Sequence, residues 1–140
     1  MNAIQIYIGI VYENKKRIAF SYQVQSLSGT IISSENRIIK QQGLENFTAH
    51  IIKQTLEESS KDDPLHIGIY TDYPDIIDYI NRLIDHRDYD HVKRIKYQPS
   101  GKLFKILKNY TIKFIIITSP KSEVFALVKQ RAMDLIDELM

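Results

Sequence analysis

The stretch IQIYIGIVYENKKRIAFSYQVQSLSGTIISSENRII, residues 4–39, decides the fold. Isoleucine recurs at every second position from Ile4 to Ile10 in the run Ile4–Tyr12, and apolar residues alternate with others over Arg17–Val24, which is typical of β-strands. The polar residues 13–16 between these runs suit a hairpin turn. A third, less regular extended run covers Thr30–Ile39. Short turns between successive strands predict an antiparallel meander of three strands.

Helices and strands alternate after the meander. Three segments carry apolar residues at helical spacing, and two short apolar runs have the length of buried strands. The expected elements are a helix over 44–58, a strand over 65–71, a helix from Pro74 to Ile84, a strand over 111–118, and a last helix that starts at Ser119-Pro120. The order β-β-β-α-β-α-β-α predicts one α/β domain, residues 1–140, with a five-stranded mixed sheet.

The composition excludes several classes of protein. The chain has 140 residues, of which 44% are hydrophobic and 26% charged, as is ordinary for a globular domain. It has no cysteine, which excludes disulfide scaffolds and thiolate metal sites and fits a cytoplasmic location. The first strand-like run has no basic leader or cleavage site, so no signal peptide is expected. No apolar stretch approaches the ~20 residues that span a bilayer, so no membrane partner is expected.

Positive charge is concentrated in one segment of the chain. Residues 91–122 carry eight Lys/Arg and no acid, whereas residues 1–90 carry nine Lys/Arg and thirteen Asp/Glu. Basic clusters neutralise phosphates, and interleaved aromatic rings can stack on bases. The predicted nucleic-acid contacts are Lys93, Arg94, Lys96, Lys102, Lys105 and Lys108, interleaved with Tyr97, Phe104 and Tyr110 and followed by Lys113 and Lys121. The alternative is a solvated helix face whose charge balances the acidic remainder.

Short motifs in two regions of the chain resemble the ribonuclease H family. Ile67–Tyr73 is an apolar strand that ends in Thr-Asp, like the strand-four signature of that family, and Ile76–Ile80 is similar to the helix that follows. Arg131–Leu135 is similar to the last-helix motif, where an arginine, a small residue and an acid recur. The resemblance covers nearly the whole chain in element order and implies a ribonuclease H-like fold.

The resemblance also implies a reaction. In that family two Mg²⁺ ions, about 4 Å apart and held by carboxylates, clamp the attacking water and the leaving oxygen of a phosphodiester. The implied catalytic residues are Asp72, which is also the implied metal ligand, Glu45 and Asp134. An active protein would be a Mg²⁺-dependent phosphodiester hydrolase, with an RNA–DNA hybrid, RNA or DNA as partner. Some members also place a basic substrate-contacting element where residues 91–110 stand.

The first strand departs from the family pattern. No acid occurs among residues 1–12, and the position of the family's central ligand falls near Gly9. Glu13 is the nearest acid, but it stands in the expected turn. Without the central carboxylate too few ligands remain to hold two ions, so little or no cleavage is expected.

Two other positions match only loosely, and each acid also has a plain structural role. Alignment on Ala49 puts Asn46, one residue after Glu45, at the first-helix position, and strict alignment of the last helix puts Met133 where Asp134 is needed. Glu45 suits the first turn of a helix, where an acid favours the dipole, and Asp134 suits a solvated helix face. By the same reasoning, the strand-four aspartate could cap the helix that follows it.

The leading interpretation is therefore a ribonuclease H-like pseudo-nuclease that contacts nucleic acid and has a depleted metal site. One alternative is a divalent-metal-dependent nuclease with rearranged carboxylates, in which Glu13 or Glu45 replaces the missing acid. The other is a non-catalytic module that uses the fold to bind a protein partner. Fold alone does not choose among them, because function depends on the site.

Overall fold

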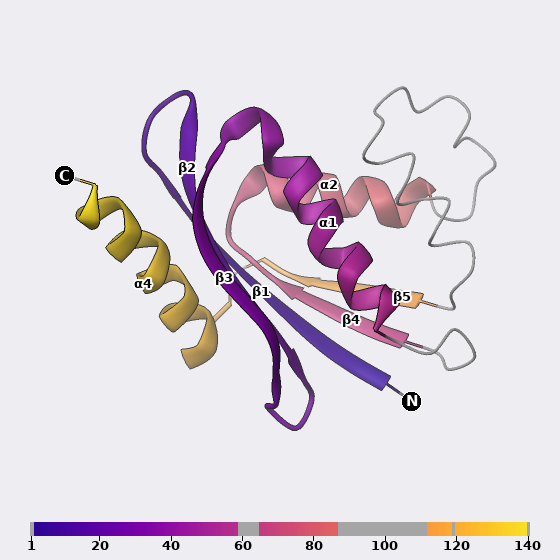
Figure 1. Ribbon diagram of the computed structural model, residues 1–140. Helices are drawn as coiled ribbons and strands as arrows, with labels where there is room; N and C mark the ends of the chain where they lie inside the picture. The colour runs from indigo at the N-terminus through magenta and orange to yellow at the C-terminus, as the bar shows by residue number, and fades with distance from the viewer. Residues whose placement is uncertain (1, 59–64, 87–111, 119, 140) are drawn as a thin grey trace.

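The computed structural model describes residues 2–58, 65–86, 112–118 and 120–139, whose strands form a five-stranded sheet in the order β3-β2-β1-β4-β5 (Figure 1). The elements are β1 (Asn2–Tyr12), β2 (Arg17–Ser26), β3 (Ile31–Lys40), the short 3-10 helix η1 (Gln41–Gly43), α1 (Leu44–Glu57), β4 (Leu65–Tyr70), α2 (Pro74–His86), β5 (Ile112–Ile117) and α4 (Glu123–Glu138). This order confirms the predicted α/β architecture.

The sheet is mixed, as the connections require. β1 pairs antiparallel with β2, with Ile6 opposite Val24, and β2 pairs antiparallel with β3. β1 pairs parallel with β4, with Ile6 opposite Ile69, and β4 pairs parallel with β5. Hairpin turns can join only antiparallel neighbours, whereas a parallel neighbour needs a longer crossover. β1 therefore lies at the centre, between the meander and the parallel pair.

The main core lies on one face of the sheet, under α1 and α2. Side chains alternate between the faces of a strand, so Ile6, Ile8 and Ile10 point to this side, where all three are buried. They pack in one cluster with residues of both helices, among them Ile52 and Ile80. The alternation read from the sequence thus corresponds to burial of this face.

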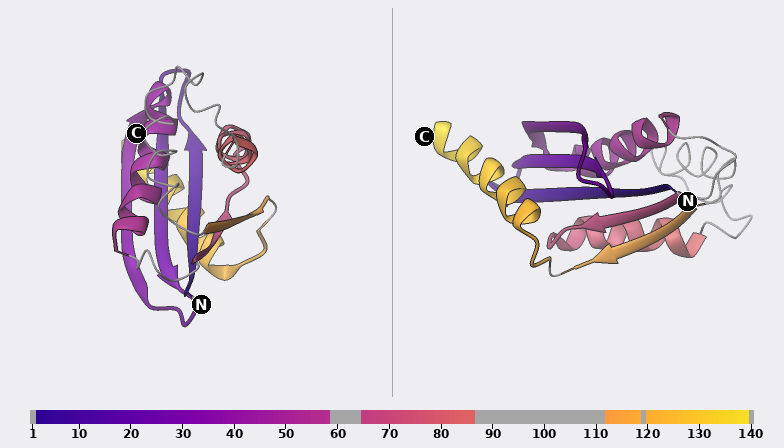
Figure 2. Two further views of the ribbon diagram at one scale, coloured as in Figure 1. Left: turned by 90° about the vertical axis from the view of Figure 1, so that its right-hand side faces the viewer. Right: turned by 90° about the horizontal axis from the view of Figure 1, so that it is seen from below.

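The opposite face of β1 is covered by α4, which crosses the strands obliquely from β1 toward β3 (Figure 2). Phe125, Val128 and Ala132 are the buried residues of this helix. Phe125 and Val128 form a second, smaller cluster with Tyr7 of β1. The two faces of β1 are therefore built differently, with a large aliphatic core on one and a single helix on the other.

Two predicted boundaries need correction. The last helix begins at Glu123 and not at Ser119-Pro120, because Ser122 caps it by accepting hydrogen bonds from the backbone nitrogens of Val124 and Phe125. The second helix runs on through His86, two residues beyond its predicted end at Ile84. Leu103, Ile106 and Leu107, whose spacing suggests a further short helix, lie outside the described residues. None of the described helices is long and apolar enough to cross a membrane.

Candidate functional site around Asp72

Asp72 is the second residue after β4, at the edge of the sheet where β4 and β5 end. The chain there is held by two hydrogen bonds: the Thr71 nitrogen donates to the Ile117 carbonyl at 3.2 Å, and the Thr71 hydroxyl accepts from the Tyr73 nitrogen at 3.3 Å. The Asp72 carboxylate accepts a hydrogen bond from the Lys129 ammonium of α4, with 2.7 Å between Oδ2 and Nζ. The two side chains are 40% and 32% exposed, so this ion pair is open to solvent and to ligands.

Gly9 of β1 explains how Lys129 reaches that position. A Cβ added at Gly9 would lie 2.7 Å from the Lys129 Cα, 2.8 Å from the Lys129 nitrogen and 3.1 Å from the Val128 carbonyl carbon. All three are backbone atoms of a helix, which cannot move aside as a flexible side chain can. The helix backbone therefore occupies the space that a first-strand acid would need, and the same close packing brings an ammonium to Asp72.

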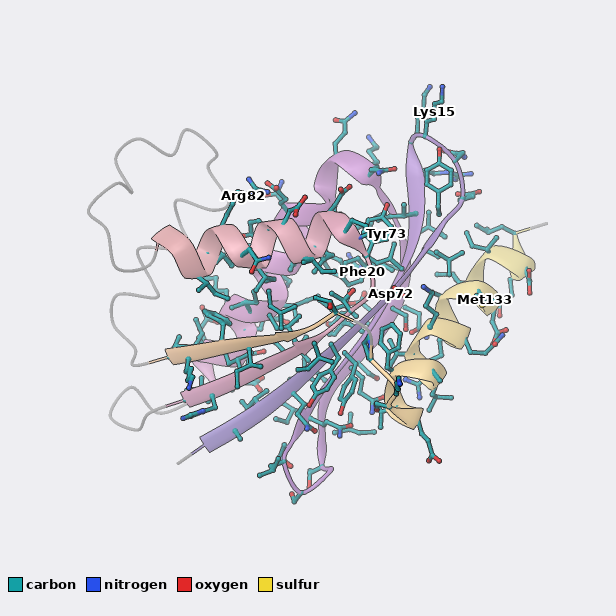
Figure 3. The ribbon with its side chains drawn as sticks, turned by 180° about the vertical axis from the view of Figure 1, so that it is seen from behind. Lys15, Phe20, Asp72, Tyr73, Arg82 and Met133 are labelled. Atoms are coloured by element: carbon teal, nitrogen blue, oxygen red, sulfur yellow. The ribbon has the colours of Figure 1, made fainter. Side chains whose placement is uncertain are left out.

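Glu45 does not join Asp72. It lies in the first turn of α1 and forms an ion pair with Arg82 of α2, and the two residues line a pocket of about 250 Å³ together with Asp75 and Asp78. Figure 3 shows Arg82 well along α2, away from the Asp72 end of that helix. The structure gives Glu45 a partner that ties the two helices together.

Asp134 does not join Asp72 either. It is exposed on α4, where it accepts a hydrogen bond from Gln130 at 2.9 Å, one helical turn earlier. Met133, which strict alignment puts at the family position, is 45% exposed. Within the part of the chain that the structure describes, no group of three or more His, Cys, Asp or Glu side chains could hold a metal ion. The three implied catalytic acids are thus dispersed over separate places.

Glu13, the acid that could replace the missing one, belongs to the turn between β1 and β2. Its Oε1 pairs with the Arg17 guanidinium at 2.9 Å, and its backbone nitrogen donates to the Arg17 carbonyl. Its Oε2 is buried and has no hydrogen-bond partner among the described residues. The arrangement stabilises the turn and leaves one carboxylate oxygen unsatisfied.

Tyr73 places a neutral hydroxyl beside this edge. Burial raises the pKa of Tyr73 above its ordinary value of 10.0, and the nearby Asp75 and Tyr12 add to the rise, whereas a hydrogen bond from Gln41 opposes it. The Gln41 amide donates to the Tyr73 hydroxyl at 3.4 Å. At neutral pH the phenol therefore keeps its proton and can donate it to an acceptor such as a phosphate oxygen.

A chain of polar side chains crosses the α4 face of the sheet. The Arg131 guanidinium donates to Gln23 at 2.9 Å, Gln23 to Gln25 at 3.0 Å, Gln25 to Gln5 at 3.3 Å, and Gln5 to the Tyr70 hydroxyl at 3.3 Å. Sequence reasoning missed this network. Its sequence signal is glutamine at the strand positions that alternate with the core residues.

Lys129 is the other residue that the sequence did not single out. It is one of two basic residues in the last eighteen of the chain, and nothing in its spacing marks it as a partner of Asp72. Only the packing of α4 against Gly9 reveals the pairing.

The predicted nucleic-acid contacts lie outside the described residues. This holds for Lys93, Arg94, Lys96, Lys102, Lys105 and Lys108. Of the same basic segment the structure describes Lys113, on β5, and Lys121, just before α4, and both are exposed.

Comparisons by sequence find no relative: no family model and no curated protein matches this chain. Comparisons of structure do find similar proteins. The N-terminal RNase H domain of a Mycobacterium tuberculosis protein, solved as a fusion with maltose-binding protein, has a TM-score of 0.60 at 9% identity, covering 99% of each chain. RNase H1 from the archaeon Halobacterium salinarum has a TM-score of 0.59 at 11% identity, covering 97% of this chain and 98% of that one.

A third similar structure was solved with its nucleic acid. LC11-RNase H1 in complex with an RNA/DNA hybrid has a TM-score of 0.58 at 13% identity, covering 97% of this chain and 98% of that one. Identities this low establish the architecture and no more. The strand order and these likenesses together show that this chain has a ribonuclease H-like fold.

Proposed function

We propose that this protein contacts nucleic acid through its ribonuclease H-like fold and has little or no nuclease activity. The observation that carries the proposal is the packing of α4 on Gly9, where helix backbone fills the space that a first-strand carboxylate would need. Asp72 has the Lys129 ammonium, at 2.7 Å, as its partner in place of a second carboxylate. The proposal includes the cytoplasmic location that the cysteine-free composition leads us to expect.

An ammonium cannot replace a catalytic metal ion in this chemistry. It carries a single charge on a strongly hydrated group and has only hydrogen-bond donors, so it neither lowers the pKa of a bound water nor bridges two reacting oxygens. If Mg²⁺ bound at this edge, Asp72 would be one ligand from this chain. Among the described residues, no group of three or more acidic or imidazole side chains would join it to hold such a hard divalent cation.

Lys129 is nevertheless suited to contact a phosphate. A solvent-exposed ion pair contributes only about 0.2–1 kcal/mol, so exchanging the Asp72 carboxylate for a phosphate oxygen costs little. The Tyr73 hydroxyl, one residue along the chain from Asp72 and held by the Gln41 amide, is a second neutral donor. These groups support backbone contact without cleavage.

The basic segment supplies the larger part of the proposed contact. Residues 91–122 hold eight Lys/Arg and no acid, and salt-dependent attraction to phosphates is the expected property of such a segment. Proteins with this fold have been solved with an RNA/DNA hybrid, for LC11-RNase H1, and with double-stranded DNA, for a foamy viral protease-reverse transcriptase. Nucleic acid is therefore the partner that we propose, with little preference for sequence.

Fluorescence anisotropy with a labelled RNA–DNA hybrid at low ionic strength tests the binding. Lys102, Lys105 and Lys108 lie at i, i+3 and i+6, close to one side of a helix if that segment is helical. Replacing all three by Gln is expected to weaken binding and to flatten the slope of log affinity against log salt by roughly one unit per lost phosphate contact.

A matched variant separates contact from net charge. Replacing Lys40, Lys53 and Lys61 by Gln removes the same charge outside the basic segment and is expected to leave the salt slope nearly unchanged. Equal losses of affinity and of salt slope in the two triple variants would show that overall charge, and not the basic segment, causes the effect. No binding by the wild-type protein at low ionic strength would contradict the proposal and favour the protein-interaction module instead.

A further inference from the structure

β3 forms an edge of the sheet and is ten residues long. Its inner side pairs with β2, and no strand among the described residues pairs with its outer side. Ile31 and Ile32, at its start, are 56% and 41% exposed. The outer edge of such a strand presents backbone N–H and C=O groups that can pair with another strand.

The centre of β3 carries two opposite charges on one face. Glu35 and Arg37 lie opposite Tyr22 and Phe20 of β2, on the α1 side of the sheet, and Asn36 between them points to the other side. The Arg37 Nε donates to Glu35 Oε1 at 2.6 Å, and the two side chains are 51% and 36% exposed. The edge therefore has a fixed charge order, negative then positive along the chain.

We propose that two copies of this chain pair through β3, antiparallel, about a two-fold axis at Asn36. Residues that lie directly opposite each other in two paired strands point to the same face of the sheet. The two-fold axis must therefore lie level with a residue and not between two residues, because only then do opposed residues share a face. An axis at Asn36 puts Glu35 of each copy opposite Arg37 of the other. An axis at Glu35 or at Arg37 would oppose like charges, which destabilises a sheet. Charge complementarity thus selects this register among the central ones.

The pairing also closes an open groove beside the strand. The groove, of about 690 Å³, lies between β3 and α1 and is lined by Tyr22, Glu35, Arg37, Phe47 and His50, among others. The Arg37 guanidinium lies over the Phe47 ring, 4.9 Å from its centroid. A second β3 alongside the first would wall this groove and join the two sheets into one of ten strands with isologous contacts.

Charge reversal tests the register by sedimentation. The wild-type mass is expected to rise toward that of two chains as concentration approaches about 1 mM. Glu35→Arg and Arg37→Glu each oppose like charges twice per dimer and should weaken dimerisation about tenfold. An equimolar mixture of the two variants should form heterodimers, and the double variant E35R/R37E should regain homodimers. Glu57→Arg, on the exposed side of α1, is the matched control and should dimerise like wild type.

Crosslinking gives an independent readout, because the chain has no cysteine of its own. Asn36→Cys puts two thiols directly opposite each other at the axis, where Cβ atoms of paired strands are about 4.5–5.5 Å apart, and oxidation should yield a covalent dimer. Ser34→Cys, whose partner position would be Ile38, should crosslink poorly. A wild-type protein that stays monomeric at about 1 mM would overturn the proposal. So would dimerisation indifferent to both charge reversals, or crosslinking at Ser34 and not at Asn36.

Discussion

Gly9 and Lys129 define the candidate site at the scale of single residues. The missing side chain of Gly9 lets the backbone of α4 lie against β1, and that approach delivers the ammonium to Asp72. A larger residue at position 9 would have to push the helix away. The glycine and the lysine are thus parts of one arrangement.

Gly9→Ala is expected to lower the free energy of unfolding by about 1–3 kcal/mol, the usual cost of overpacking, because the added methyl would meet helix backbone at 2.7 Å. Urea unfolding measures this. Gly68→Ala on β4 is the matched control, since its Cβ would meet only the Tyr70 ring, at 3.3 Å, and a ring can turn aside. Equal losses for the two variants would contradict the close packing of α4 on Gly9.

Tyr7 is expected to make the free energy of unfolding depend on pH in the alkaline range. Burial raises the pKa of Tyr7 above its ordinary value of 10.0, the charge of Tyr70 adds to the rise, and a hydrogen bond with Ser122 opposes it. A raised folded-state pKa gives stability that is fully present below the unfolded-state value and is lost as pH rises through the folded-state value.

Unfolding free energy should therefore fall above about pH 10 more steeply for the wild-type protein than for Tyr7→Phe, which has no proton to lose there. Urea titrations at several pH values between about pH 8 and pH 11 provide the comparison. Parallel pH profiles for the two proteins would contradict a raised pKa of this phenol in the folded protein.

At the scale of elements, α4 depends on its first turn. The Ser122 hydroxyl accepts from the backbone nitrogens of Val124 and Phe125, at 3.1 and 3.4 Å. Ser122→Ala should cost about 1 kcal/mol of stability, and Ser122→Thr, which keeps the hydroxyl, should cost less. Hydrogen exchange localises the effect: the amides of α4 should lose protection in the alanine variant before those of β1. Unchanged α4 protection would contradict the capping role.

The sequence predicts a helix or strand well wherever apolar residues keep one spacing over several residues. Isoleucine at alternate positions from Ile4 to Ile10 predicts β1, because apolar β-branched residues at every second position are typical of a strand. The start of α4 was misplaced by a few residues. Both Ser119-Pro120 and Ser122 look like helix starts, and the choice depends on which hydroxyl meets free backbone amides.

At the scale of the whole molecule, the site is less predictable than the fold. The sequence suggested Asp72, Glu45 and Asp134 from a resemblance in order along the chain. Their positions in space depend on how α1 and α4 pack against opposite faces of the sheet, which local patterns do not encode. The structure pairs each carboxylate with a different neighbour: Lys129, Arg82 and Gln130 respectively.

The measurement that tests the central claim most directly is cleavage of an RNA–DNA hybrid by the purified wild-type protein in Mg²⁺, beside Asp72→Asn under the same conditions. A site whose carboxylate is held by Lys129, beneath a helix that excludes a first-strand acid, should leave the hybrid intact in both samples. Binding in the same buffer confirms that the substrate is engaged. Sustained Mg²⁺-dependent turnover by the wild-type protein that disappears in Asp72→Asn would contradict the account and establish a nuclease with rearranged ligands.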